Sequence, residues 1–262
     1  MNYWHALILA IVEGLTEFLP VSSTGHMIIV ANLLGIGQAP FTEVYITSIQ
    51  FGAILSVVAL YWRRFLQSFD FYLKLAVAFI PFGILGFVLK DVITELLKSV
   101  TVVAVSLVLG GLILLFVDKW FDGERKQVTT PNIKQAFKIG LFQCIALIPG
   151  VSRSAATIVG GLSQGFDRRS AADFSFLLAV PTMFVITAYQ LYKAYKITPL
   201  QPGDLQVLAF GNVVAFVVAL LAVNSFVNFV SRFGFRSFGI YRIGIGVIIL
   251  LMIGLGIDLQ LI

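Results

Sequence analysis

Long apolar runs separated by short polar segments dominate the hydrophobic pattern of this chain. A membrane-spanning helix needs about 20 consecutive, predominantly apolar residues. Runs of this kind predict six spanning helices, at 43–62, 71–90, 99–118, 171–192, 205–229 and 238–257. The pattern therefore predicts an all-α polytopic membrane protein.

Two further apolar stretches are interrupted in the middle. Residues 4–34 are broken by Pro20 and the VSSTG that follows it, and residues 136–163 are broken by PGVSRS at 149–154. Non-helical backbone at membrane depth is tolerated only where protein or a water-filled cavity surrounds it. Each broken stretch therefore predicts a helix–loop–helix hairpin that re-enters the membrane from one side.

The two halves of the chain also resemble each other at an offset of 130 residues. This offset brings Glu13 onto Gln143, Ser22 onto Ser152 and Glu43 onto Asp173. Each half then contains one hairpin and three spans, so the second half enters the membrane inverted. We expect a single membrane domain, 1–262, in which residues 1–118 form pseudo-repeat 1, 119–135 a cytoplasmic connection and 136–262 pseudo-repeat 2. Such inverted repeats place a site near the bilayer midplane, where broken helices meet.

Composition supports the membrane assignment. Hydrophobic residues make up 59% of the chain and charged residues 12%, whereas soluble domains carry roughly a quarter charged residues. The net charge of +5 lies in scattered short loops, which argues against a nucleic-acid partner. Cys144 is the only cysteine, so an intramolecular disulfide and a cysteine metal cluster are excluded. The N-terminal MNYWHALILA has no basic residue ahead of its apolar run, so we expect no cleaved signal peptide.

The distribution of Lys and Arg predicts the orientation. With both hairpins returning to their own side, one face has only Lys90, Lys98, Lys193 and Lys196. The other face collects Arg63, Arg64, Lys74, Lys119, Arg125, Lys126, Lys134, Lys138, Arg168, Arg169, Arg232, Arg236 and Arg242. By the positive-inside rule the richer face is cytoplasmic. Both termini and the 35–42 loop are then expected on the outer, periplasmic side.

Arg153 belongs to neither face, because it lies within the second break. Ionisable residues inside a membrane usually face a partner or a polar cavity and indicate a functional site. Glu13 and Glu17 are four residues apart and share a helix face. The turn after them carries Ser22, Ser23, Thr24 and His26. These groups and Arg153 predict a polar pocket inside the bilayer.

The groups in this pocket suit phosphate chemistry. Arginine presents a planar fork that matches phosphate, and Ser152 and Ser154 flank it at the start of a helical stretch, where free N–H groups favour an anion. Hydrolysis also needs a nucleophile, for which Ser23 and His26 remain alternatives, and a proton carrier. Glu13 and Glu17 are candidate ligands for Mg²⁺ or Ca²⁺, which prefer oxygen. A substrate that reaches this depth is expected to be a lipid phosphate.

At family level, EGLTEFLPVSSTGH at 13–26 and PGVSRSAATI at 149–158 resemble the two signatures of the undecaprenyl-diphosphate phosphatase family, associated with bacitracin resistance. QFGAILSVV at 50–58, FSFLLAVP at 174–181 and IYR at 240–242 extend the resemblance; Asp173 stands where Glu is expected. It implies hydrolysis of undecaprenyl diphosphate to the monophosphate carrier lipid of peptidoglycan synthesis, in the bacterial inner membrane. By motif position the resemblance carries functional roles onto Glu13, Glu17, Ser23, His26 and Arg153. We expect Glu17, Ser23, His26 and Arg153 to be catalytic, and the substrate-binding residues to be Glu13, Ser22, Thr24, Gln50, Ser152 and Ser154.

Two other functions compete with this assignment. Type-2 phosphatidate phosphatases share fragments of SSTGH and SRS, but they need a second histidine after the SR motif, and this chain has only His5 and His26. A transporter or flippase for a polyprenyl phosphate lipid would suit an inverted repeat equally well. The oligomeric state stays open, with a homodimer as an alternative to a monomer.

Overall fold

The computed structural model describes residues 1–37, 39–66, 68–121, 130–197, 200–201, 203–257 and 259, and the chain is helical throughout these ranges apart from its turns. The elements are α1 (Tyr3–Thr16), α2 (Ser23–Leu33), α3 (Pro40–Leu60), α4 (Trp62–Phe65), α5 (Phe69–Val88), α6 (Lys90–Leu97), α7 (Val100–Trp120), α8 (Ile133–Cys144), the short 3-10 helix η1 (Ile145–Leu147), α9 (Arg153–Ser163), α10 (Arg168–Ile197), α11 (Asp204–Phe233) and α12 (Arg236–Gly254).

Six of these helices are long and apolar enough to cross a membrane: α3, α5, α7, α10, α11 and α12. They confirm the predicted six spans, with boundaries that differ by a few residues. The short helices α4 and α6 lie between spans and were not predicted, because four and eight residues are too few to stand out in a hydropathy pattern. The chain is a polytopic membrane protein.

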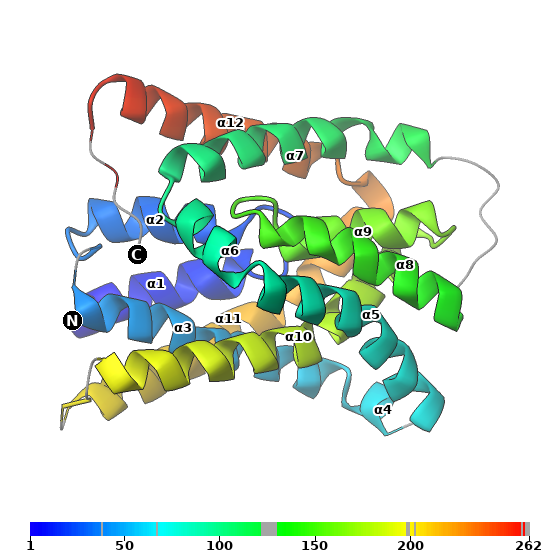
Figure 1. Cartoon of the computed structure of the whole chain (residues 1–262), viewed down its shortest axis with the longest axis horizontal. Helices are drawn as coiled ribbons and strands as arrows, with labels where there is room; N and C mark the ends of the chain where they lie inside the picture. Colours follow the sequence, from blue (N-terminus) through cyan, green and yellow to red (C-terminus); the bar gives the residue numbers. More distant parts are fainter. Residues whose placement is uncertain are drawn as a thin grey trace.

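The two broken stretches are both pairs of short helices joined by a turn. Residues 17–22 separate α1 from α2, and η1 with residues 148–152 separates α8 from α9. In Figure 1 the α1–α2 pair extends inward from the end that carries both termini, and the α8–α9 pair extends inward from the opposite end. Their turns meet in the middle, where the Ser154 hydroxyl donates to Leu19 O over 2.8 Å.

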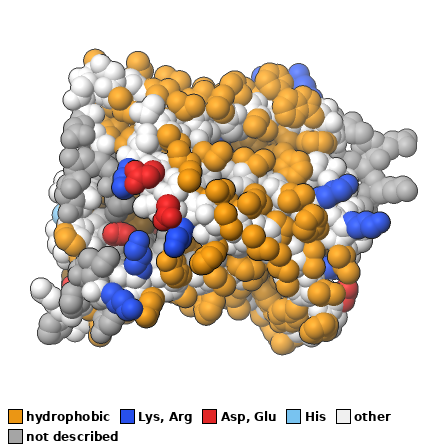
Figure 2. Space-filling model, in the orientation of Figure 1, with side chains coloured by type: hydrophobic (Ala, Val, Ile, Leu, Met, Phe, Trp, Pro, Cys, Tyr) orange, Lys and Arg blue, Asp and Glu red, His pale blue; other side chains and the backbone are white. Residues whose placement is uncertain are grey.

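Long helices enclose these two hairpins. Helix α1 packs on α11, α8 packs on α5, and α7 pairs closely with α12. Small residues allow the last contact, since a Cβ added at Gly239 would lie 2.8 Å from Gly111 O. Hydrophobic side chains cover the middle of the surface in Figure 2, and charged side chains gather toward both ends. The hairpin turns thus lie among the long helices, and the middle of the face drawn in Figure 2 is apolar.

One basic residue is not where the charge count placed it. Arg242 was assigned to the cytoplasmic face, but its side chain is fully buried (0% exposed) and bonds to carbonyls of both hairpin turns. The assignment was wrong because breaks in helices leave carbonyls that can satisfy a buried guanidinium. Arg125 and Lys126 of the same count lie outside the described residues. Without Arg242, twelve basic residues remain on that face in the predicted topology.

Candidate functional site

Two serines with an unusual backbone mark the tips of the hairpins. Ser22 has φ 68° and ψ 98°, and Ser152 has φ 75° and ψ 118°. They are the described non-glycine residues with positive φ. A residue with a Cβ adopts this region only when its surroundings over-determine it, and such strain concentrates at functional sites. Each serine directly precedes an 11-residue helix, α2 or α9.

The N-termini of these helices differ in how they are capped. Ser152 Oγ accepts from the N–H of Ala155 over 3.3 Å, which is an ordinary N-cap. Ser22 makes no such side-chain bond. The first N–H groups of α2 therefore have no side-chain acceptor from the N-cap, and an anion bound there would satisfy them.

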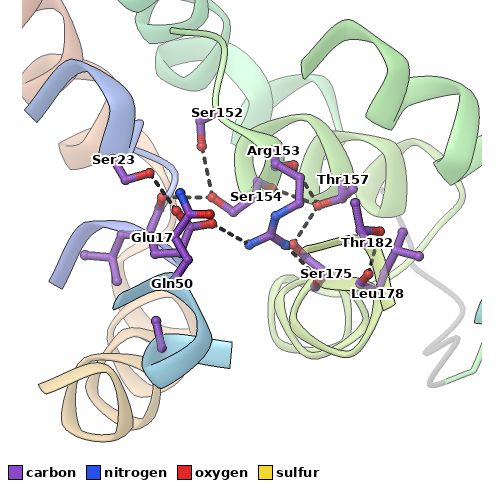
Figure 3. A network of polar contacts seen from close by, with 12 residues as sticks. Glu17, Ser23, Gln50, Ser152, Arg153, Ser154, Thr157, Ser175, Leu178 and Thr182 are labelled. Carbon is purple, nitrogen blue, oxygen red and sulfur yellow. Dashed lines mark hydrogen bonds and ion pairs between the residues drawn. The ribbon is translucent and has the colours of Figure 1, made fainter. Parts of the chain in front are cut away.

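Glu17 contacts a side chain of each hairpin through its two carboxylate oxygens (Figure 3). Ser23 Oγ donates to Glu17 Oε2 over 2.6 Å, and Arg153 Nη2 lies 3.3 Å from Glu17 Oε1. Both partners of the ion pair are about 10% exposed, so water screens the pair only partly. The serine hydroxyl thus already points its proton at a carboxylate whose other oxygen is held by a cation.

The remaining contacts of Arg153 hold it at the edge of α10. Its Nη1 donates to Ser175 O over 3.1 Å, and its guanidinium carbon lies 5.7 Å from the centre of the Phe18 ring. Within the described part of the chain, its buried Nε has no hydrogen-bond partner. An arginine can make five such bonds, so this one keeps donor capacity for a ligand.

A cavity of about 1020 Å³ opens beside these residues. Its polar lining includes Glu17, Ser22, Ser23, Thr24, Gln50, Ser152 and Arg153, and its apolar lining includes Phe79, Phe82 and Phe87 of α5. Lys90 and Lys98, at the two ends of α6, and Lys193 of α10 also line it. The cavity therefore combines a polar base, an apolar wall and a basic rim.

Gln50 and Ser154 contact other protein groups around this base. Gln50 Oε1 accepts from Thr187 Oγ1 over 3.0 Å, which leaves its NH₂ group for other partners. Ser154 is fully buried, does not line the cavity, and bridges Ser152 Oγ (2.9 Å) and Leu19 O (2.8 Å). Ser154 therefore joins the two turns.

Glu13 lies one turn before Glu17 and is fully buried. Neither of its carboxylate oxygens makes a hydrogen bond of ordinary geometry among the described residues, and the group that it faces is the carboxyl of Glu17, close enough for a hydrogen bond if one of the two carboxyls carries a proton. A carboxylate without a partner is costly to bury, so the position calls for a proton or a cation. Among the described residues, no group of three or more His, Cys, Asp and Glu side chains could hold a metal ion.

His26 lies apart from the cavity lining, against α12. Its Nδ1 is 2.7 Å from Ser22 O and its Nε2 is 2.7 Å from the hydroxyl of Tyr241. A carbonyl only accepts, so Nδ1 carries the proton, and in the neutral ring Nε2 accepts from Tyr241. Both ring nitrogens are engaged and the imidazole is not part of the cavity lining, so a catalytic role of His26 stays a prediction.

Sequence reasoning missed several residues of this region. Tyr241 contacts His26, Ser175 holds Arg153, and Thr187 contacts Gln50. The IYR segment at 240–242 was noticed as a likeness to a family, and its position in a long apolar run was the available signal for a buried role. Ser175 and Thr187 carry no such signal, since Ser and Thr are common in membrane helices.

The fold and this site define a polytopic membrane protein with a polar, phosphate-compatible site enclosed between two interrupted helix pairs. Residues 6–248 match the family described as bacitracin resistance protein BacA. The chain belongs to this family. It is 53% identical over 267 residues to the undecaprenyl-diphosphatase of Bdellovibrio bacteriovorus, covering 100% of both chains. Its identity to the undecaprenyl-diphosphatases of Flavobacterium johnsoniae and Porphyromonas gingivalis is 55% and 47%, with 96% and 99% of both chains covered.

Proposed function

We propose that this chain is an undecaprenyl-diphosphatase, which hydrolyses undecaprenyl diphosphate to undecaprenyl phosphate and inorganic phosphate. Sequence identity of 53% and 55% to relatives of that name, over 100% and 96% of both chains, supports the activity. The structural observation that supports it most is that Glu17 contacts both Ser23 and Arg153 at the base of a cavity with an apolar wall. The enzyme acts in the bacterial plasma membrane, where it recycles the carrier lipid of peptidoglycan synthesis and confers bacitracin resistance.

Ser23 is the proposed nucleophile. Its Oγ attacks the terminal phosphorus and passes its proton to Glu17, while the bond to the bridging oxygen breaks and undecaprenyl phosphate leaves with the electron pair. Water then cleaves the phosphoserine and releases phosphate. Ser23 lines the cavity and His26 does not, which favours Ser23 over His26. Arg153 and the uncapped start of α2, with Ser22 and Thr24 beside it, offset the charge of the transferring group.

His26 has a different proposed role, as a fixed support for the first turn. Its bond to Ser22 O holds the carbonyl of the strained residue, and Tyr241 holds the ring. Gln50 and Ser152 contact the diphosphate from the other walls of the cavity. With His26 as a support, Glu17 is the proposed acceptor of the proton that Ser23 releases.

Glu13 and Glu17 are the proposed ligands of a divalent cation. The unpartnered oxygens of Glu13 fit such an ion, and Mg²⁺ commonly takes one or two protein carboxylates together with substrate phosphates. The ion would neutralise charge on the diphosphate. Activity should fall with EDTA and return with added Mg²⁺ or Ca²⁺. Full activity in excess EDTA would leave Glu13 as a carrier of a proton.

We further propose an inverted repeat with both termini on the periplasmic side. The matched positive-φ serines and the equal lengths of α2 and α9 support the repeat. The remaining excess of basic residues at the end opposite the termini supports the orientation. In this orientation the cavity opens outward, toward a diphosphate head group left on the outer face. A monomer and a homodimer are both compatible with this arrangement, and the mass of the purified protein in detergent separates them.

The decisive experiment measures phosphate release by the purified protein in detergent, from a polyprenyl diphosphate. A phosphatase releases phosphate without any bilayer to cross. A transporter or flippase for the same lipid would release none and would move lipid only in vesicles. Absence of phosphate release by folded protein, with and without Mg²⁺ and Ca²⁺, would overturn the proposed function.

A further inference from the structure

Arg242 makes the most extensive set of side-chain hydrogen bonds in the described chain without taking part in the proposed reaction. Its Nη1 donates to Pro20 O (3.2 Å) and Val151 O (2.9 Å), its Nη2 to Gly150 O (3.0 Å) and Ser106 O (3.2 Å), and its Nε to Leu107 O (3.4 Å). A guanidinium has five N–H donors. All five bonds go to main-chain carbonyls, and the side chain does not line the cavity.

These carbonyls come from three separate parts of the fold. Pro20 belongs to the first hairpin turn, Gly150 and Val151 to the second, and Ser106 and Leu107 to the middle of α7. One side chain of α12 therefore connects both turns to the α7–α12 pair. Gly150 shows how close this packing is, because a Cβ added there would lie 2.5 Å from Val103 O of α7.

Arg242 holds the carbonyl directly before Ser152, that of Val151, and the carbonyl two residues before Ser22, that of Pro20. The Val151 carbonyl and the Ser152 N–H belong to one trans peptide, in which the two groups point in opposite directions. Holding Val151 O on α12 thus turns the Ser152 N–H away from α12. Among the described residues no acceptor is found for this N–H, although Ser152 lines the cavity. The N–H groups of Val21 and Val151, in contrast, already donate to Leu19 O and Ile148 O.

Among the described residues the charge of Arg242 has no carboxylate partner, since all five of its hydrogen bonds go to carbonyls. A buried cation in a low-dielectric interior acts over longer distances than one in water. An anion in the adjoining cavity would compensate part of this charge. Both effects, the orientation of N–H groups and the fixed positive charge, favour a bound diphosphate.

We propose that Arg242 is a positioning residue for the diphosphate, which holds both hairpin turns together by their carbonyls and turns the Ser152 N–H toward the phosphate. The proposal rests on the proposed function for the identity of the anion. It assigns to α12 a part in substrate binding although α12 does not line the cavity. The preceding residue, Tyr241, contacts His26, which in turn holds the Ser22 carbonyl of the first hairpin turn.

Two variants test this role in different ways. Arg242→Lys keeps the charge but offers three donors on one nitrogen in place of five on a planar group, so at least two of the five carbonyls lose their donor. Gly110→Ala keeps Arg242 itself but would place a Cβ 2.2 Å from Arg242 Nη2, which forces the guanidinium to shift. Arg236→Lys and Gly244→Ala are matched controls on α12, because Arg236 is exposed and a Cβ at Gly244 meets nothing within 4 Å.

The readout is the inhibition constant of inorganic pyrophosphate against hydrolysis of a short-chain isoprenoid diphosphate in detergent. This constant does not depend on how much of the protein is active, so lower stability alone leaves it unchanged. Loss of an oriented donor should raise it about tenfold in Arg242→Lys and in Gly110→Ala. The two control variants should stay at the wild-type value.

An inhibition constant within twofold of wild type in folded Gly110→Ala or folded Arg242→Lys would overturn the proposal. If Arg242→Lys does not fold, Gly110→Ala decides alone. If the wild-type protein releases no phosphate, the proposed function fails, and calorimetric binding of pyrophosphate to the same variants still tests the role of Arg242. A tenfold weaker binding in those variants would then support it for an anion site of another function.

Discussion

The two hairpin turns have similar backbones and different chemistry. Both place a serine with positive φ directly before an 11-residue helix. The first turn presents a carboxylate, Glu17, and a hydroxyl, Ser23, and leaves its helix uncapped. The second presents a guanidinium, Arg153, and caps its own helix through Ser152. Two turns of similar backbone thus present the proposed reacting groups on one side and a positive charge on the other.

This difference explains why the two turns must be held together. Glu17 meets Arg153 only across the interface between the hairpins, and Ser154 and Arg242 join the same turns through main-chain carbonyls. Neither turn contains a complete site. The comparison therefore predicts that substitutions in the first turn abolish chemistry, whereas those in the second weaken it through charge and geometry.

The largest effect is expected from Ser23→Ala. Removal of the proposed nucleophile should lower kcat by about 10³- to 10⁴-fold, and Glu17→Gln should give a similar loss because the serine then lacks its proposed base. Phosphate release by purified protein in detergent measures both. Ser231→Ala is the control, since Ser231 only donates to Val227 O of its own helix. More than a tenth of wild-type kcat in Ser23→Ala would return the role of nucleophile to His26.

A smaller loss is expected from Arg153→Lys in the second turn. Lysine keeps the charge but cannot contact Glu17, Ser175 and a phosphate oxygen through one planar group. A decrease in kcat/KM of about 100-fold is expected, as when one transition-state donor is lost. Arg236→Lys on α12 serves as the control. Near-normal turnover in Arg153→Lys would refute the proposal that the planar guanidinium is needed to offset the charge of the transferring group.

The sidedness of the two turns can be measured by cysteine labelling. In a chain with Cys144→Ser, single cysteines at Ser22 and Thr24 should react with an impermeant thiol reagent added outside oriented cells. A polyprenyl diphosphate analogue should slow that reaction severalfold, because both positions line the cavity. A cysteine at Ser163, at the far end of α9, is the matched comparison and should react only after permeabilisation. Labelling of Ser22 and Thr24 only from the cytoplasmic side would reverse the proposed orientation.

Much of this fold follows from local features of the sequence, and the relation between the turns does not. Hydropathy is a property of consecutive residues, so six spans and two interrupted stretches are readable from the chain. Pro20 and Pro149 likewise predict where helices break. The contacts of Arg242 with Pro20 and Gly150 join residues 222 and 92 positions apart. No local pattern indicates such contacts, and for the same reason Arg242 was assigned to a membrane face.

The site was predictable in its residue types but not in its internal geometry. The motifs place Glu17, Ser23 and Arg153 on two breaks, and the three side chains contact one another beside the cavity, whereas their roles in catalysis stay predictions. His26 follows Ser23 by three residues, yet its ring turns toward Tyr241, because a helix start allows neighbouring side chains to face different partners. Which helix start is capped depends on rotamers that spacing does not determine.

The smallest effect concerns the strain shared by the two turns. Glycine adopts positive φ without steric cost, so Ser22→Gly should relieve strain and raise stability by about 1 kcal/mol, or about 2–4 °C in Tm. Ser152→Gly should gain less, because it also removes the N-cap to Ala155 and the contact with Ser154. Ser231→Gly within α11 should lower Tm, since glycine weakens a helix interior. Thermal unfolding in detergent measures all three. A lower Tm for Ser22→Gly than for Ser152→Gly would mean that the Ser22 side chain stabilises the first turn, and the proposed difference between a capped and an uncapped turn would be wrong.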